Sequence, residues 1–400
     1  MIDPKAQVRF ALSGLLSLIL LSLGCGSGAP ANSIVGNPIV NGPTWTQLTG
    51  LPAAMAANGA LLTAGSDGYL YSQAHITSSG AINVFRTLAS SPTTWTDITG
   101  TGLPIANPGS IGITPNGTVF MATSTGAGND DVYTWNGPAS SPAWSKVTGW
   151  NGVSSSLIYS FANDSAGYTY FSPAWSGDIW RNDAPNSKNF TRIIANLYGI
   201  TNGGASGHPT TGGLYQLQIW NLGDGKGDMI WTCGEGELDN IALTGAPTSN
   251  TAYLTTARGY TGNCTALDKS ATNILALRTA DSALDTLSSI NVATRAVTIH
   301  PSPAARTASS FPNNIGASEV GTLHWMSGTN FILSAYANSG SPTFLLLSTD
   351  DGTTWTDITA SGAINSTCTG ANLSVGSVVT SHYIFARCQD GRAIWRYGPL

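Results

Sequence analysis

Four acidic residues are the candidates for acid–base chemistry in this chain: Asp67, Asp131, Glu235 and Glu237. A glycoside hydrolase needs two carboxyl groups, about 5 to 9.5 Å apart, one as proton donor and one as base or nucleophile. Asp67 lies in an Asp-Gly pair, and an aspartate in such a turn commonly accepts hydrogen bonds from its own backbone. The residue types therefore permit hydrolysis, but their spacing does not show which two would face each other.

The only concentration of acidic residues in the sequence could bind a cation. Asp224-Gly-Lys-Gly-Asp228 precedes Glu235-Gly-Glu237-Leu-Asp239. Carboxylate oxygens at this density suit Ca²⁺, although the spacing differs from the EF-hand loop, and glycine-flanked aspartates also serve plain hairpin turns. The five histidines are dispersed without zinc spacing. We therefore expect no cofactor, with a structural Ca²⁺ held by Asp224 and Asp228 as the alternative.

Three tryptophans in predicted loops, Trp150, Trp175 and Trp325, could stack on the rings of a sugar ligand. Packing in the core is the other interpretation of each, because tryptophan supplies a large apolar area. No Gly-x-Ser-x-Gly motif marks a serine nucleophile.

The N-terminus predicts export. Lys5 and Arg9 precede an apolar run from Phe10 to Leu23, which is shorter than the roughly 20 residues of a membrane span. Leu21-Ser22-Leu23-Gly24-Cys25 resembles a bacterial lipobox, which implies lipid attachment at Cys25; an ordinary signal peptide cut nearby is the alternative. The expected divisions are a signal peptide at 1–24, a flexible tether at 25–36 and a folded domain at 37–400. The implied location is the cell surface or outer membrane of a bacterium, with the lipid as the only membrane contact.

Composition favours an extracellular all-β domain. Charged residues are 9% of the chain, with 16 basic and 21 acidic residues scattered along it, so nucleic acid is not an expected partner. Beyond Cys25, four cysteines remain: Cys233, Cys264, Cys368 and Cys388. In an exported chain they suggest disulfides, most simply Cys233–Cys264 and Cys368–Cys388, although three pairings are possible and free buried thiols are an alternative.

An aromatic residue followed by a short polar strand recurs at intervals of about 50 residues, which indicates the blades of a propeller. Clear copies contain Trp45, Trp95, Trp144, Phe190 and Trp355, and weaker ones lie at 238–243 and 284–287. We interpret them as outermost strands. A preceding motif, which we interpret as the third strand, occurs at 131–135, 178–180, 228–231 and 392–395. Seven copies favour seven four-stranded antiparallel blades, and six or eight remain compatible.

The two chain ends are predicted to share one blade. The chain stops after a third-strand motif at Trp395 and begins, after the tether, with an outermost strand at Trp45. Pairing of these segments would remove a free sheet edge.

The segment with the sharpest signature contains Ser348, Asp350, Gly352, Thr354 and Trp355. Its pattern, S-x-D-x-G-x-T-W, resembles the Asp box (BNR repeat) of the sialidase-type β-propeller superfamily. In that superfamily the box is structural, and its members include sialidases, xyloglucan-cleaving glycosidases, sortilin-like receptors and a photosystem assembly factor.

The sequence does not support sialidase activity. Sialidases bind the carboxylate of the substrate with three arginines, and the arginine motif that usually marks the first of them is absent; only three glutamates are present. The resemblance and the predicted anchor therefore favour a cell-surface propeller that binds a glycan or a surface protein and is not an enzyme. A secreted glycoside hydrolase and an assembly factor for a membrane complex are the alternatives.

Overall fold

A computed structural model describes the chain from residue 44 to residue 400, with gaps, and all of these residues belong to the unit Ile39–Leu400. The described ranges are 44–55, 61–75, 82–124, 130–150, 158–173, 178–195, 214–234, 237–243, 250–254, 263–280, 283–299, 322–336, 343–358, 373–379, 382–388 and 393–400. The predicted signal peptide, the tether and Cys25 lie outside them. In these ranges no helix is long and apolar enough to cross a membrane.

The described strands form seven antiparallel sheets of four strands each. The first strands are β2 Leu61–Ala64, β6 Asn107–Ile113, β10 Ile158–Asn163, β14 Leu214–Asn221, β18 Asn263–Lys269, β22 Thr322–Ser327 and β26 Leu373–Val379. The second strands are β3 Tyr69–His75, β7 Val119–Ser124, β11 Thr169–Pro173, β15 Asp228–Gly234, β19 Asn273–Ala280, β23 Asn330–Tyr336 and β27 Ile384–Cys388.

The third strands are β4 Ile82–Leu88, β8 Asp130–Trp135, β12 Ile179–Asn182, β16 Glu237–Ala242, β20 Ala283–Asn291, β24 Thr343–Ser348 and β28 Ile394–Tyr397. The fourth strands are β5 Thr96–Asp97, β9 Ser145–Lys146, β13 Phe190–Ile194, β17 Asn250–Leu254, β21 Val297–Ile299, β25 Thr356–Asp357 and β1 Trp45–Gln47. A short 3₁₀ helix, η1 Ala53–Met55, follows β1.

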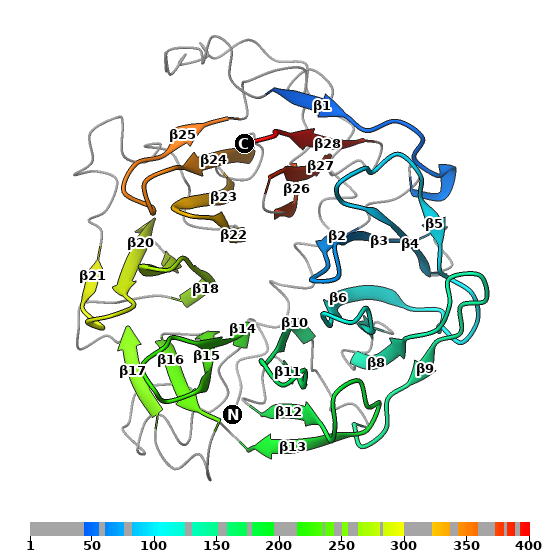
Figure 1. Ribbon diagram of the computed structural model, residues 1–400, viewed down its shortest axis with the longest axis horizontal. Coiled ribbons are helices and arrows are strands. Elements are labelled where there is room, and N and C mark those ends of the chain that lie inside the picture. The colour runs from blue at the N-terminus through cyan, green and yellow to red at the C-terminus, as the bar shows by residue number, and fades with distance from the viewer. Residues whose placement is uncertain are drawn as a thin grey trace. The chain divides into compact units, whose positions relative to one another are not determined.

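The sheets are arranged about a common centre, with their first strands innermost (Figure 1). Each first strand contacts the first strand of the next sheet, and β26 contacts β2. This is a β-propeller with four-stranded antiparallel blades, as the sequence predicted. Because neighbouring strands alternate in direction, the turn between the first and second strands of a sheet lies at the same end of the strands as the turn between the third and fourth, where the chain makes that turn.

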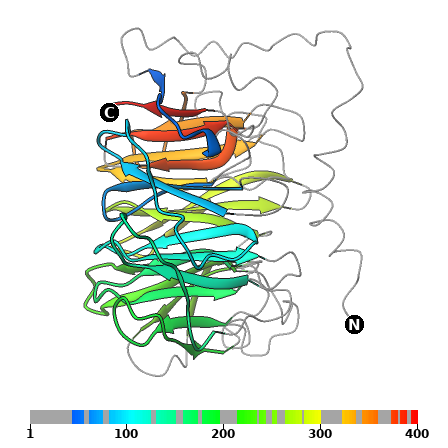
Figure 2. The ribbon, with the colours of Figure 1, turned by 90° about the vertical axis from the view of Figure 1, so that its right-hand side faces the viewer.

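The sheet that contains the C-terminus takes its outermost strand from the other end of the chain. Strand β1 pairs antiparallel with β28, with Trp45 opposite Tyr397 and Gln47 opposite Trp395. Figures 1 and 2 both show blue β1 beside red β28. The two rings of Trp45 and Tyr397 pack with centroids 5.2 Å apart, and the Trp45 indole N–H donates to the carbonyl of Ile358 in the neighbouring sheet at 2.8 Å.

Three of the strand assignments made from the sequence were wrong by one strand within their sheet. Residues 228–231, expected in a third strand, lie in the second strand β15, and the expected outermost strands near 241 and 286 are the third strands β16 and β20. The true outermost strands, β17 and β21, carry no tryptophan. Neither strand has the tryptophan or phenylalanine that marks the other fourth strands, and the leucine patterns of the preceding strands resemble the repeat instead.

The hydrophobic core is divided among the contacts between neighbouring sheets. Each cluster of buried side chains in the described residues joins two adjacent sheets; one of them packs Leu62 and Leu70 against Phe385 and Ile394. Trp45, Trp144 and Trp355 are buried, as expected for packing residues. Burial of apolar surface at roughly 25 cal/mol per Å² makes these contacts the main source of stability.

The segment 348–355 forms a turn held by its own side chains. The Ser348 hydroxyl donates to Asp350 Oδ1 at 2.9 Å and accepts from the Gly352 N–H at 2.9 Å, while both carboxylate oxygens of Asp350 accept from Thr354. Burial raises the pKa of Asp350, but the hydrogen bonds from Thr354 and Ser348 outweigh it and hold the pKa below its usual range. Gly352 has φ +85°, and a Cβ there would lie 2.5 Å from Leu275. The signature residues thus have structural roles.

Two other turns are held by an aspartate and a tyrosine. Asp164 accepts from the N–H of Tyr168 at 2.8 Å and from the hydroxyl of Tyr170 at 2.8 Å. Asp67 has the same relation to Tyr71, whose hydroxyl donates to it at 2.6 Å. Burial, followed by the hydrogen bond to its aspartate, raises the pKa of each tyrosine, so both phenols stay protonated.

Replacing Tyr170 by phenylalanine is expected to lower the free energy of unfolding by about 1–2 kcal/mol, because Asp164 loses a hydrogen-bond donor in a half-buried site. Denaturant unfolding of Tyr170→Phe, Asp164→Asn and the double variant measures the coupling between the two residues. Additive losses would show that the hydrogen bond contributes nothing.

Candidate functional site

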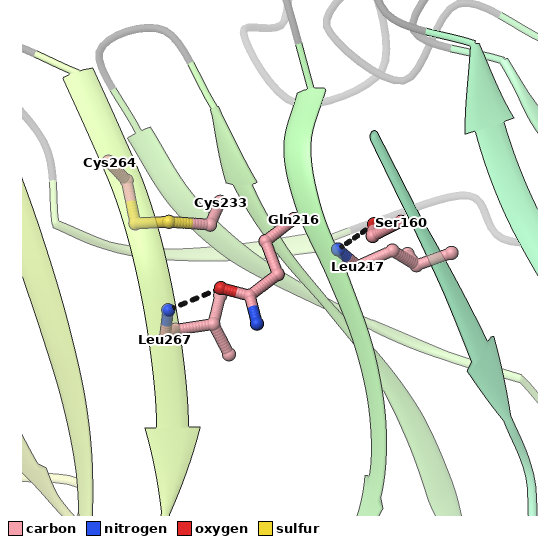
Figure 3. The surroundings of a disulfide bond; sticks show 6 residues. All are labelled: Ser160, Gln216, Leu217, Cys233, Cys264 and Leu267. Carbon is pink, nitrogen blue, oxygen red and sulfur yellow. Dashed lines mark hydrogen bonds between the residues drawn. A yellow bond between two sulfur atoms is a disulfide. The ribbon is translucent and has the colours of Figure 1, made fainter. Parts of the chain in front are cut away.

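Consecutive first strands are joined by hydrogen bonds between a side chain of one strand and the backbone of the next. These bonds run from Ser110 Oγ to the Ile158 carbonyl (2.7 Å), from Leu217 N–H to Ser160 Oγ (2.8 Å), from Leu267 N–H to Gln216 Oε1 (2.6 Å) and from Trp325 N–H to Asp268 Oδ2 (2.7 Å). Figure 3 shows the second and third of them. We call them the first-strand bonds. Among these four, only the last uses an ionisable side chain.

Asp268 lies near the end of β18 and connects two sheets. Its Oδ1 accepts from the Lys269 N–H at 2.8 Å, and its Oδ2 accepts from the Trp325 N–H on β22. Part of the residue reaches solvent, while its carboxyl group lies among protein atoms. Burial raises the pKa of Asp268 to about 6, although the two N–H groups and the charge of Lys269 act to lower it. A buried carboxyl group of this kind is found at many functional sites.

The second residue of this site is exposed. Trp325 is 37% exposed, and it is the only exposed one among the eleven tryptophans that the structure describes. Its indole N–H donates to the Gly328 carbonyl at 3.1 Å, which ties the ring to the β22–β23 turn. Strand β22 lies close to the centre of the sheet arrangement (Figure 1), and Trp325 lies near its end, next to the β22–β23 turn. An exposed and oriented indole of this kind can contact the apolar face of a ligand.

The structure assigns structural partners to two of the catalytic candidates. Asp67 holds the β2–β3 turn through Tyr69 and Tyr71. Asp131 forms an ion pair with Lys146 at 2.7 Å, between the third and fourth strands of its sheet. The two residues belong to different sheets, and each is held by a partner in its own sheet. Glu235 and the side chain of Glu237 lie outside the described residues.

The two cation-site candidates bind different partners. Asp224 pairs with Arg295 at 2.5 Å; that hydrogen bond is the largest influence on the pKa of Asp224, which lies below its usual range. Asp228 accepts from the backbone and hydroxyl of Ser165, at 2.8 and 2.6 Å, and so connects two sheets. Among the described residues, no group of three potential metal ligands occurs.

Trp150, expected to be available for stacking, is 1% exposed, which contradicts that expectation. Its ring packs edge-on against Phe171 and Trp180, with centroids 5.4 and 5.1 Å away. A neighbouring sheet covers the residue, and the local sequence pattern does not show this. Trp175 lies outside the described residues.

One disulfide joins two sheets. Cys233 on β15 is bonded to Cys264 on β18, at a sequence separation of 31, as one of the expected pairings proposed (Figure 3). Both half-cystines are buried in the cluster between the two sheets. Cys368 and the side chain of Cys388 lie outside the described residues.

Asp268 was not a candidate from the sequence. Aspartate is uncommon inside strands, and Asp268 directly follows the apolar pair Ala266-Leu267 near the end of one. An aspartate at such a position was the only sign in the sequence that Asp268 belongs to a site. The approach of Trp325 from a strand more than 50 residues later could not be inferred from it.

Comparisons with known proteins show the fold alone. No family model matches the chain, and no curated protein matches it in sequence. Virginiamycin B lyase from Staphylococcus aureus has a TM-score of 0.56 at 13% identity, over 90% of this chain and 99% of that one. A structure of YCF48 bound to D1 peptide has a TM-score of 0.57 at 13% identity, over 90% and 96%.

A third structure is the GH74 xyloglucanase from Xanthomonas campestris, with a TM-score of 0.56 at 14% identity, over 88% of this chain and 53% of that one. The chain is similar to β-propellers. A lyase, a peptide-bound protein and a glycoside hydrolase share this fold, so it does not decide the activity.

Proposed function

We propose that this chain is an exported propeller that binds a glycan, with Trp325 as the aromatic contact. The single observation that supports it is the exposure of Trp325, which contrasts with the burial or partial burial of the other described tryptophans. A planar indole offers a large apolar face at little cost in conformational entropy, and the bond to Gly328 reduces that cost further. The predicted lipid at Cys25 would hold this protein at a bacterial cell surface.

The environment of the described aspartates supports binding over catalysis. Asp67, Asp131, Asp224 and Asp228 each have a structural partner that holds a turn or joins strands. A carboxylate in such a contact stabilises the fold, and its use as a catalytic group would break that contact. The Asp-box resemblance fits this proposal, because the box residues 348–355 also form a structural turn.

A glycoside hydrolase is the second candidate, favoured by Asp268. Its pKa of about 6 is suited to a general acid near neutral pH, and it touches the backbone of the exposed Trp325. Both of its oxygens already accept backbone N–H groups. Binding therefore remains the first proposal.

The experiment is a binding panel of soluble polysaccharides, measured by calorimetry with wild type and Trp325→Ala. We expect at least one polysaccharide to bind and the variant to lose tenfold or more in affinity. Trp220→Ala is the matched control, because that partly buried ring packs on Trp231. Binding of no polysaccharide, or equal binding by Trp325→Ala, would contradict the proposal and favour a protein partner.

A further inference from the structure

A hollow lies between two neighbouring sheets, β14–β17 and β18–β21 (Figure 1). Three segments line it: residues 222–224 between β14 and β15, residues 271–272 between β18 and β19, and residues 291–293 at the end of β20 and in the turn that follows. Its volume of about 310 Å³ is within the range of small-molecule sites. Neither Asp268 nor Trp325 is among the described residues that line it, so the hollow is separate from the site described above.

The segments that line the hollow are tied to one another. The Val292 N–H donates to the Thr272 carbonyl at 2.8 Å, within the β18–β21 sheet. The Arg295 guanidinium donates to the Val292 carbonyl and forms the ion pair with Asp224 at 2.5 Å, which joins the two sheets. Leu222 and Val292 also pack against the buried cluster that contains the disulfide. The hollow is thus preformed, and a ligand would not have to order its walls.

Asp224 supplies hydrogen-bond acceptors to the hollow. Its carboxylate accepts from Arg295 and, at 3.2 Å, from the Lys226 N–H, and its side chain is 27% exposed. A carboxylate has about four acceptor positions, so about two remain for a ligand, whose hydroxyl can bind without breaking the ion pair. The Arg295 guanidinium keeps the pKa of Asp224 below its usual range, and hydrogen bonds to an ionised group are stronger than bonds between neutral groups.

Asn291 supplies a donor, and aliphatic side chains supply an apolar surface. The side-chain oxygen of Asn291 accepts from the N–H groups of Ala293 and Thr294, at 3.1 and 2.9 Å, so its NH₂ group remains for a ligand. Leu222 and Val292 line the hollow beside these polar groups. A few placed polar groups on an apolar lining match a sugar ring, which has apolar C–H faces and hydroxyls that both donate and accept.

We propose that this hollow is a second saccharide-binding site, which takes one neutral sugar residue with its hydroxyls on Asp224 and Asn291. The inference goes beyond the proposed function, because it involves neither Trp325 nor Asp268. The charges of the site select a neutral ligand. The Arg295 guanidinium beside Asp224 disfavours a metal cation, and the carboxylate that faces the hollow disfavours an acidic sugar.

Titration calorimetry with trisaccharides tests the proposal in the Trp325→Ala background, where the indole of the first site cannot contribute. The panel contains the neutral trisaccharides of glucose, xylose, mannose and N-acetylglucosamine, with the trisaccharide of galacturonic acid as the acidic comparison. We expect at least one neutral trisaccharide to bind, and the acidic one to bind at least tenfold more weakly. Adding Asp224→Asn should weaken binding of the neutral trisaccharide about tenfold, because the hydrogen bonds to an ionised group are lost.

Asp131→Asn is the matched control, because the Asp131 side chain is 25% exposed and also pairs with a cation, Lys146, in another sheet. This change should leave the affinity unaltered. Binding of no neutral trisaccharide, equal binding of the acidic one, or equal affinities after Asp224→Asn and Asp131→Asn would overturn the proposal. The comparison of neutral and acidic ligands is decisive even where Asp224→Asn fails to fold. A failure of the glycan contact at Trp325 leaves these outcomes unchanged, because every protein in the test carries Trp325→Ala.

Discussion

Replacing Trp45 by alanine is expected to lower the free energy of unfolding by about 3–5 kcal/mol, as is usual for a large aromatic residue removed from a core. The side chain is 5% exposed and packs against Tyr397, Trp395 and Leu347 in one cluster. Its indole N–H also reaches the Ile358 carbonyl in the neighbouring sheet. The variant thus weakens both the β1–β28 pairing and the contact with the β22–β25 sheet.

Denaturant unfolding of Trp45→Ala measures this loss, with Trp325→Ala as the matched control. The same change at the exposed Trp325 should cost much less, about 1 kcal/mol or below, because less apolar area is lost. Equal losses at the two positions would show that β1 adds little to the stability of its sheet.

Removing the Cys233–Cys264 disulfide is expected to cost about 3–4 kcal/mol. The bond closes a loop with a sequence separation of 31, and constraining a loop of that length removes entropy from the unfolded chain. Alanine is the appropriate replacement, because both positions are buried in an apolar cluster. Thermal unfolding of Cys233→Ala/Cys264→Ala, compared with wild type, measures the loss.

A reductant provides the control for this prediction. It should lower the melting temperature of wild type towards that of the double variant and leave the double variant nearly unchanged. A double variant as stable as oxidised wild type would contradict the prediction.

The sequence was sufficient to predict the architecture because the repeat is encoded locally. Trp45, Trp144 and Trp355 each stand at or just before a fourth strand and are buried, so their spacing follows the blades. The fourth strands β17 and β21 lack a tryptophan. In these two sheets the sequence pattern therefore indicates the third strand as the outermost one. Each of these errors stayed within its own sheet, so the periodic pattern still indicated four-stranded blades.

The candidate site could not be predicted in the same way. The Asp268–Trp325 bond joins residues 57 positions apart on different sheets, and neither residue has a local motif. Trp150 and Trp325 looked alike in sequence, but a neighbouring sheet covers Trp150 and leaves Trp325 exposed. Burial of a side chain between sheets depends on packing, which a single repeat does not encode.

The assay that most directly tests the proposed function measures binding and new reducing ends in the same mixture. A polysaccharide that binds in the panel is incubated with stoichiometric wild type, Trp325→Ala or Asp268→Asn. We expect wild type to bind the polysaccharide without releasing reducing ends, and Trp325→Ala to bind it more weakly. Reducing ends that wild type releases and Asp268→Asn does not would contradict it and establish a glycoside hydrolase.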